Sequence, residues 1–553
     1  MRDLIWHSKL PVSVASGLLM AFAWYPHGLP FLMFIAFIPL LFLSDASISE
    51  GKKNAFGRGI LLFYPAFLTF NLITTYWIAY CTVYGAIAAV VLNALLQTVV
   101  FALWHSCKKC SKNRLLQAIL LVSSWIAFEY LHQNWDLTWP WLSLGNVFAT
   151  TPKIVQWYSL TGAAGGTLWV LLCNLILHRI ICLCVDRAGK RRVIVNSALL
   201  LLAIATPIIV SLAMLPSAMR GVDTSTPVDA VVVQQNTDPW TEEYSLTNVQ
   251  EIDRLLSLAV PLVKPSTSLV VTPESSVAHG ISVDNLRNGD FLPEDTRYSG
   301  FARFDSVVKN CPNLNFILGL STFVVSDKKM SPSATKMASD VFVESYNTAG
   351  FYNSNGLESV YHKSRLVPGV EKMPFPRIFG FLGDILIELG GSNSSLGVDT
   401  VQRVFTFEAD GKRVGVGTAI CYESVYGELV GRFVTNGANV IAVITNDSWW
   451  KDSQGHRQHF EMARLRAIET RRYVLRAANG GFSGVVDPLG NVLEKTGYDQ
   501  RTAFATRVYA QNGETFYVRH GDYIARIAAI IAVLGLTASA ITALTGVFKR
   551  RRK

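Results

Sequence analysis

The sequence predicts a multi-pass α-helical membrane domain, one large α/β domain and a last membrane helix. Half of the 553 residues are apolar and only 16% are charged, which is too apolar for an ordinary soluble enzyme. Long apolar segments fill the first 220 residues and return near the C-terminus. The predicted parts are a membrane domain with about seven transmembrane helices at 1–220, an α/β domain at 221–520, and a span with a basic tail at 521–553.

Eight apolar segments approach the roughly 20 residues that a helix needs to cross the hydrocarbon core of a bilayer. They lie at 11–25, 30–44, 57–80, 84–104, 115–131, 157–181, 194–215 and 524–547. The first two are short, so a re-entrant hairpin is an alternative to two full crossings at that end.

Basic residues gather in alternate loops between these segments. Arg2 precedes the first segment, Lys52 and Lys53 follow the second, and the stretch 187–192 after the sixth is also basic, whereas the intervening loops carry almost no Lys or Arg. Basic loops remain in the cytoplasm, so eight spans with both termini inside fit this pattern. The α/β domain would then lie outside the cytoplasm.

Charge and cysteine usage exclude several other classes of protein. The net charge of +10 comes from the membrane segments and the last five residues, because residues 220–548 hold 30 basic and 34 acidic side chains. A nucleic-acid partner is therefore not expected. The eight cysteines are too sparse for a disulfide framework, and the single pair Cys107 and Cys110 has no second pair that would complete a zinc site. We expect no metal and no cofactor.

Two features of the membrane domain allow two interpretations each. The tryptophan-rich loop at 134–145 is typical of an interfacial aromatic belt, or it forms a platform at the level of the lipid headgroups. Glu129 is a carboxylate at membrane depth, which makes it a functional candidate, although a hydrogen-bonded structural role fits equally well.

Short β-branched runs alternate with helical patterns through residues 221–520. The runs lie at Ala230–Val233, Ser268–Val271, Asn315–Leu318, Val414–Ile420 and Asn439–Ile444. His459–Arg472 has apolar and charged residues at helical spacing, and Gly484–Leu493 is typical of a hairpin. This alternation predicts an α/β domain with one core.

Three reactive side chains lie at strand ends or in nearby loops. Glu274 follows an apolar strand and can serve as a general base. Lys363 can present a fixed positive charge to a developing oxyanion. Cys421 ends a strand and precedes the helix-like run Val425–Phe433, whose N-terminus favours a thiolate. Taken singly, a surface glutamate, a solvated lysine and an inert thiol are the commoner interpretations, but the three together favour nucleophilic catalysis.

Several motifs resemble those of the nitrilase, or carbon–nitrogen hydrolase, superfamily. They are Pro273-Glu274-Ser275, the loop from Lys363 to Glu371, Ile420–Glu423, Thr445–Trp449, Arg464–Glu469 and Asn479–Gly490. The resemblance implies an αββα sandwich with a Glu-Lys-Cys triad. The order of the whole chain, with membrane segments first and one last helix, resembles the bacterial apolipoprotein N-acyltransferases.

That resemblance implies lipoprotein maturation through a thioester intermediate. An acyl chain passes from a phospholipid, typically phosphatidylethanolamine, to a cysteine, and then to the α-amino group of a diacylglyceryl-cysteine apolipoprotein. Carried over by position, Glu274 is the general base, Lys363 the oxyanion stabiliser and Cys421 the nucleophile. The resemblance also implies supporting or substrate-binding roles for Glu371, Tyr422, Glu423 and Trp240, the last on a mobile substrate loop.

Two other functions compete with this interpretation. A membrane-tethered amidase or nitrilase-type hydrolase would pass the acyl group to water, but it would not require eight spans. A transporter or receptor with an inactive nitrilase-like domain would not require the triad. Replacement of Cys421 separates these classes, because transport would survive it and both enzymatic functions would be lost.

Overall fold

The computed structural model of the protein divides into two compact units. It describes residues 9–24, 28–51, 53–219, 225–243, 245–288, 299–338, 340–376 and 395–551. The first unit joins the N-terminal helices to the chain from Asp522 onward, and the second comprises Met214–Gly521 and the three residues Tyr80–Thr82. Arg2 and Lys52, which entered the topology prediction, lie outside the described residues.

The first unit is helical. Its main helices are α2 (Lys9–Ala23), α3 (Ile38–Ser49), α4 (Ala55–Thr75), α5 (Val83–Cys107), α6 (Arg114–Leu131), α8 (Ala163–Val185), α9 (Lys190–Met219) and α18 (Tyr523–Arg551). Seven helical segments in the described part of the chain are long and apolar enough to cross a membrane, and they correspond to the second through eighth predicted segments. The first prediction corresponds to α2, whose 15 residues make it shorter than a full span.

Glu129 fastens a loop to the helices inside this unit. Its side chain is buried on α6 and accepts hydrogen bonds from Trp125 Nε1 at 3.0 Å, Leu144 N at 2.8 Å and Thr167 Oγ1 at 2.7 Å. Three donors from three segments favour the structural interpretation of this carboxylate. Trp141, in the tryptophan-rich loop, is also buried in the unit, so it contributes to packing there and not to a lipid-facing belt.

The second unit contains two β-sheets. The first sheet runs in the order β14-β1-β2-β4-β6-β5, with β3 beside β4 and β7 beside β6. Its strands are β1 (Thr226–Gln234), β2 (Thr267–Val271), β3 (Val277–Ser282), β4 (Asn315–Ser326), β5 (Thr335–Ala338), β6 (Val341–Asn353), β7 (Gly356–His362) and β14 (Thr502–Ala510). The second sheet runs in the order β13-β12-β11-β10-β9-β8. Its strands are β8 (Val404–Ala409), β9 (Lys412–Ile420), β10 (Val440–Thr445), β11 (Val474–Ala478), β12 (Gly484–Val486) and β13 (Val492–Lys495).

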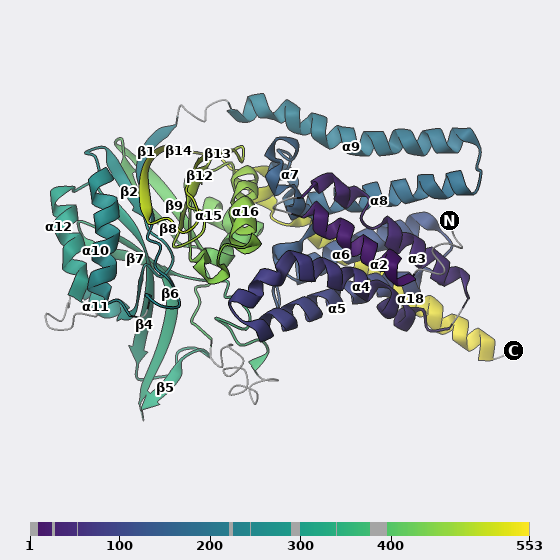
Figure 1. Ribbon diagram of the computed structural model, residues 1–553, viewed down its shortest axis with the longest axis horizontal. Coiled ribbons are helices and arrows are strands. Elements are labelled where there is room, and N and C mark those ends of the chain that lie inside the picture. The colour runs from purple at the N-terminus through teal and green to yellow at the C-terminus, as the bar shows by residue number, and fades with distance from the viewer. Residues whose placement is uncertain are drawn as a thin grey trace. The chain divides into compact units, whose positions relative to one another are not determined.

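The two sheets pack face to face between two layers of helices. Strand β1 contacts β11 and β6 contacts β9 across the interface. Figure 1 shows α10 (Asn248–Ala259), α11 (Val283–Asn288) and α12 (Ala302–Asn310) beside the first sheet, and α15 (Gly427–Thr435) and α16 (Gln454–Thr470) beside the second. This is an αββα sandwich, so the predicted fold class of a helical membrane domain plus a nitrilase-like domain is confirmed.

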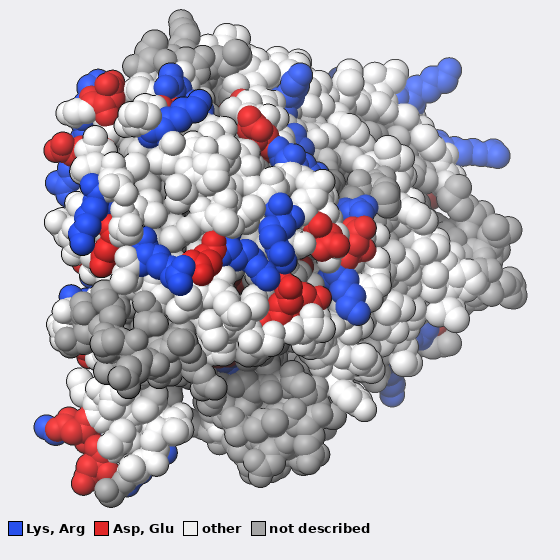
Figure 2. All heavy atoms as spheres, turned by 60° about the vertical axis from the view of Figure 1, so that its left-hand side comes forward, with Lys and Arg blue, Asp and Glu red and all other residues white. Residues whose placement is uncertain are grey.

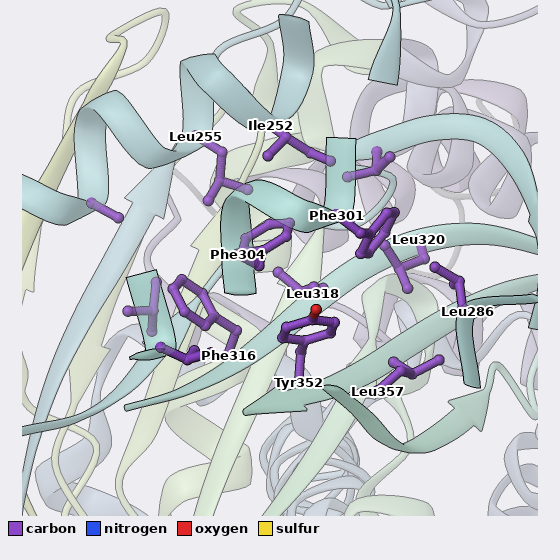
Figure 3. Close-up of a cluster of buried hydrophobic side chains, with 14 of the residues drawn as sticks. Ile252, Leu255, Leu286, Phe301, Phe304, Phe316, Leu318, Leu320, Tyr352 and Leu357 are labelled. Carbon is purple, nitrogen blue, oxygen red and sulfur yellow. The ribbon is translucent and has the colours of Figure 1, made fainter. Parts of the chain in front are cut away.

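A large apolar cluster fixes the first sheet beneath its helices. Figure 3 shows Leu255 of α10 and Phe304 of α12 packed toward Phe316 of β4 and Tyr352 of β6. Burial of each such side chain contributes about 1.5–3 kcal/mol to folding. The strands that carry site residues at their ends are therefore held by a rigid core.

One face of the protein mixes both signs of charge. Figure 2 shows Lys and Arg interspersed with Asp and Glu among uncharged residues on one face. Exposed pairs such as Arg432 and Glu428 on α15, 3.1 Å apart, contribute only about 0.3–0.5 kcal/mol each. Such pairs keep the surface soluble and do little to decide the fold.

The predicted strands and the predicted hairpin are confirmed, although several boundaries differ. The helix expected over His459–Arg472 is α16, which ends at Thr470 because Arg471 has φ +54°. A residue in the left-handed region cannot continue a right-handed helix, so the chain turns there toward β11.

Candidate active site

The three predicted reactive residues all lie just beyond strand ends and are all buried. Glu274 follows β2 and Lys363 follows β7, both in the first sheet, whereas Cys421 follows β9 in the second. Because β9 and β10 run in parallel with Ile420 opposite Ile444, Cys421 and Thr445 are neighbours at the same sheet edge. The face-to-face packing of the sheets brings the strand ends together.

Glu274 is held by donors from three directions. Its Oε1 lies 3.0 Å from Lys363 Nζ and accepts a 2.6 Å hydrogen bond from Asn347 Nδ2, and its Oε2 accepts from the backbone N of Asn446 at 2.8 Å. Gly319 of β4 makes room for this turn, because an added Cβ would lie 1.9 Å from the Pro273 carbonyl oxygen. The carboxylate is therefore fixed in one orientation.

Lys363 lies between two carboxylates. Its Nζ is 3.0 Å from Glu274 Oε1 and 2.8 Å from Glu371 Oε1. Burial alone would lower the pKa of Lys363, but these two carboxylates together raise it well above its usual range. The lysine is therefore a permanent cation at the site, suited to stabilise a developing negative charge and unsuited to act as a base.

Cys421 occupies a strained backbone conformation with φ +51°. Left-handed geometry costs an ordinary residue about 1–2 kcal/mol, and it persists only where the surroundings enforce it. Burial and the nearby carboxylate of Glu274 raise the pKa of the Cys421 thiol well above its usual range, although Lys363 opposes them. The resting side chain of Cys421 is therefore a thiol.

The helix after Cys421 differs from the prediction. Residues Cys421–Val425 form a short 3-10 helix, η10, and the α-helix α15 starts only at Gly427. The Glu423 side chain accepts a 2.8 Å hydrogen bond from Ile420 N, which closes a tight turn at the end of β9. The N-terminus of α15 is thus not at the thiol, and the prediction that it favours a thiolate there is wrong.

Glu371 and Glu423 brace the lysine and the cysteine respectively. Glu371 contacts Lys363 directly, and its Oε2 accepts from Val367 N at 2.8 Å. Glu423 is fully buried and accepts from Tyr361 Oη at 2.6 Å and from Ser364 N at 2.7 Å. Because Ser364 follows Lys363 and Glu423 lies two residues after Cys421, this carboxylate ties the lysine loop to the turn at the end of β9.

Tyr422 and Trp240 lie apart from the ionic centre of the site. Tyr422 is buried and meets Tyr426 edge to face, with ring centroids 5.3 Å apart. Trp240, in the loop after β1, is half exposed and packs edge to face on Trp449 at 4.8 Å. Trp449 belongs to the same turn as Asn446, so Trp240 borders the segment that binds Glu274.

Sequence reasoning missed Asn347 of β6. Its Nδ2 donates to both Glu274 and Glu371, at 2.6 and 3.1 Å, and its carbonyl oxygen accepts from Lys363 N at 2.8 Å. The hairpin turn at Asn353–Gly356 is recognisable in the sequence, and regular pairing counted back from it would place Asn347 opposite His362. A register shift between Phe351 and Tyr352 displaces the pairs beyond it by one residue, so His362 pairs with Thr348 instead.

One group of side chains among the described residues has the spacing of a metal site. It consists of Asp45, His178 and Cys182 in the first unit. Asp45 lies 3.2 Å from His178 Nε2 and also forms an ion pair with Lys108. The ammonium group already neutralises the carboxylate, so this cluster has the character of a partly exposed ion pair.

Two family models match the chain. The apolipoprotein N-acyltransferase N-terminal domain matches residues 16–176, and carbon-nitrogen hydrolase matches residues 230–515.

The chain is also similar to named proteins over nearly its whole length. It is 28% identical over 532 residues to an apolipoprotein N-acyltransferase of Chlorobaculum tepidum, covering 95% of each chain. It is 25% identical over 548 residues to the one of Thermotoga maritima, covering 96% of this chain and 93% of that one. Among solved structures it is similar to Saccharomyces cerevisiae Nit3, a member of the nitrilase superfamily, at 17% identity and a TM-score of 0.32, covering 51% of this chain and 90% of that one.

Proposed function

This chain belongs to the carbon–nitrogen hydrolase family, and we propose that it is an apolipoprotein N-acyltransferase that works through a thioester on Cys421. The observation that carries the proposal is the 95% coverage of both chains in the match to a protein of that name. The match includes the membrane unit as well as the hydrolase-like unit. A membrane-tethered amidase, the alternative function, would share only the second of these.

In the first half of the reaction, Cys421 attacks a phospholipid ester. Glu274 takes the thiol proton as the sulfur bonds to the ester carbonyl carbon, and Lys363 Nζ and a backbone N–H stabilise the oxyanion. When the tetrahedral intermediate collapses, the C–O bond of the ester breaks. The leaving lysophospholipid takes the proton from Glu274, and the acyl chain remains on Cys421 as a thioester.

In the second half, the α-amino group of a diacylglyceryl-cysteine apolipoprotein attacks the thioester. Glu274 accepts the amine proton while Lys363 again stabilises the oxyanion. The C–S bond breaks, the thiolate of Cys421 recovers its proton from Glu274, and an amide is released. The raised pKa of the Cys421 thiol favours this return to the protonated resting state.

The membrane unit suits the substrates of this reaction. Exposing an acyl chain to water costs about 0.8 kcal/mol per methylene group, so both lipids should reach Cys421 without leaving the bilayer interface. The proposal places residues 1–220 and 521–553 in the bacterial inner membrane, with both termini cytoplasmic and residues 221–520 periplasmic. Phosphatidylethanolamine is the proposed acyl donor, and Trp240 the proposed substrate contact on the loop after β1.

Intact mass spectrometry after incubation with phosphatidylethanolamine tests the first half-reaction. The purified full-length protein should gain one acyl mass, labile to hydroxylamine and located on Cys421. Cys421→Ala should abolish the adduct, whereas Cys311→Ala, which removes a half-buried thiol of the same unit, should retain it. An adduct that survives Cys421→Ala, or no adduct on the wild-type protein, would contradict the proposal.

A further inference from the structure

A buried chain of polar side chains links Asp447 to the backbone of the nucleophile. His459 of α16 has Nδ1 2.9 Å from Asp447 Oδ1 and Nε2 2.9 Å from Ser424 Oγ. Ser424 Oγ in turn donates to the carbonyl oxygen of Cys421 at 2.7 Å. All of these side chains are buried, so solvent does not compete for their hydrogen bonds.

The positions of the hydrogen atoms in this series of hydrogen bonds can be assigned from its acceptors. The Cys421 carbonyl oxygen can only accept, and the Ser424 hydroxyl already donates its single hydrogen to it. His459 Nε2 faces Ser424 Oγ at 2.9 Å and the same carbonyl at 3.2 Å, so it must carry a hydrogen to bond with either. The ring is fixed on its other side, where Nδ1 also lies 2.9 Å from Arg476 Nη2.

A second set of hydrogen bonds connects Asp447 to Cys421. Its Oδ1 accepts a 2.8 Å hydrogen bond from Thr445 Oγ1, and the Thr445 side chain is itself hydrogen-bonded to the Cys421 thiol. Its Oδ2 accepts from Arg476 Nη2 at 2.7 Å, which neutralises the buried carboxylate. Asp447 is therefore connected to the Cys421 thiol through Thr445, and to the Cys421 carbonyl oxygen through His459 and Ser424.

We infer that Asp447, His459 and Ser424 are positioning residues that hold Cys421 in its φ +51° conformation and so aim the thiol at the ester carbonyl. None of the three is placed against substrate. A strained backbone persists only where neighbours over-determine it, and here both the carbonyl and the thiol of the strained residue are bound. The inference rests on the proposed function for its kinetic consequence, but the structural restraint is independent of the substrate.

Single-turnover acylation by phosphatidylethanolamine tests the kinetic consequence. His459→Gln and Asp447→Asn should slow formation of the Cys421 adduct about 100-fold, as expected for a misplaced reacting group, and leave the lipid concentration at half-maximal rate within about twofold. Ser424→Ala, which removes one oxygen, should slow it about tenfold. The Ser424→Ala/His459→Gln double variant should be no slower than His459→Gln alone, because the two residues act in series.

His456→Gln is the matched control. His456 is buried one turn earlier on α16, where it stacks on Phe482 with ring centroids 4.7 Å apart and faces Asp452 at 3.4 Å. It should acylate at the wild-type rate even if its melting temperature falls. Multiplicative effects in the double variant, an equal loss in His456→Gln, or a wild-type rate in folded Ser424→Ala would overturn the inference.

A measurement without lipid separates this inference from the proposed function. In protein made with carbonyl-labelled cysteine, the Cys421 carbon resonance is identified by its loss in Cys421→Ser. Loss of the hydrogen bond from Ser424 should move this resonance upfield in Ser424→Ala and not in His456→Gln. If the resonance does not move, the positioning role is wrong. If it moves while the wild-type protein forms no acyl adduct, the positioning role stands and the proposed function fails.

Discussion

The two sheets of the second unit contribute different kinds of side chain to the site. The first sheet contributes charge: Glu274 and Lys363 form an ion pair that Glu371 extends. The second sheet contributes Cys421, a neutral thiol held through its backbone by hydrogen bonds. At rest the carboxylate of Glu274 is therefore already paired, and the thiol of Cys421 is already protonated. The site is therefore preorganised but unreactive until a substrate binds.

The largest expected effect comes from removing the central cation of the first sheet. Lys363→Met leaves two carboxylates buried without their partner, so the free energy of unfolding should fall by about 3–5 kcal/mol and acylation should become undetectable. The double variant Lys363→Met/Glu371→Gln removes one of the stranded charges and should recover part of the stability but none of the activity. Equilibrium denaturation and adduct formation measure the two effects. Activity in the double variant would contradict the oxyanion role of Lys363.

A second variant displaces the base without touching any charge. Gly319→Ala puts a Cβ 1.9 Å from the Pro273 carbonyl oxygen and 2.7 Å from the Glu274 Cα, so the turn must move and acylation should fall about 100-fold. Gly350→Ala is the control on the neighbouring strand, because the nearest atoms to its Cβ belong to the side chains of Leu320 and Leu357, at 2.8 and 3.0 Å, and not to backbone. Equal rates for the two variants would show that the position of Glu274 is not critical.

A smaller effect should follow from loosening the tie between the sheets. Glu423→Gln replaces a carboxylate that accepts from Tyr361, Ser364 and Ile420 with an amide that must turn a donor toward one of them. The cost of an unsatisfied buried group is about 1–3 kcal/mol, and we expect an acylation rate about tenfold lower. Glu408→Gln, at an exposed position of β8, should change neither the melting temperature nor the rate.

The smallest effect on acylation is expected at Glu251, a buried carboxyl group on α10 where the change falls on stability instead. Burial raises the pKa of Glu251 to about 8, although a hydrogen bond from Ala278 N opposes the shift. Between its unfolded pKa, about 4.5, and about 8, the folded protein holds this proton more tightly than the unfolded chain. The contribution of Glu251 to stability is therefore full at low pH and is lost as the pH rises through this window.

Glu251→Gln should remove that pH dependence. Relative to the wild-type protein, the variant should become more stable as the pH is raised from 5 to 8.5, by at most about 1.4 kcal/mol per pH unit. Urea unfolding at several pH values measures the difference. A stability difference that is constant across this range would show that Glu251 is ionised in the folded protein throughout.

The sequence located the reactive groups more readily than the groups that hold them. Glu274 and Cys421 follow recognisable apolar strands and Lys363 lies in a nearby loop, so local pattern together with the family resemblance was enough to find them. The donors around them come from distant segments: Asn446 binds Glu274 across 172 positions of sequence. Such pairings depend on how two sheets face each other, which no local pattern encodes.

The same reason explains the errors at the nucleophile. The sequence predicted a helix close behind Cys421, but the side chain of Glu423 closes a 3-10 turn first. His459 was predicted only as part of an amphipathic helix, because its partners Asp447 and Ser424 lie 12 and 35 positions away. A buried histidine on a helix has no sequence signature that distinguishes a packing role from a hydrogen-bonded one.

The partition of the isolated acyl-enzyme tests the central claim most directly. Protein acylated on Cys421 and freed of phospholipid would be mixed with a diacylglyceryl lipopeptide, with the same lipopeptide acetylated at its α-amino group, or with buffer alone. The account predicts that only the free amine discharges the thioester at an appreciable rate and that the product carries the acyl chain as an amide. Discharge at the same rate in buffer, or onto no amine at all, would contradict it and identify the protein as a hydrolase.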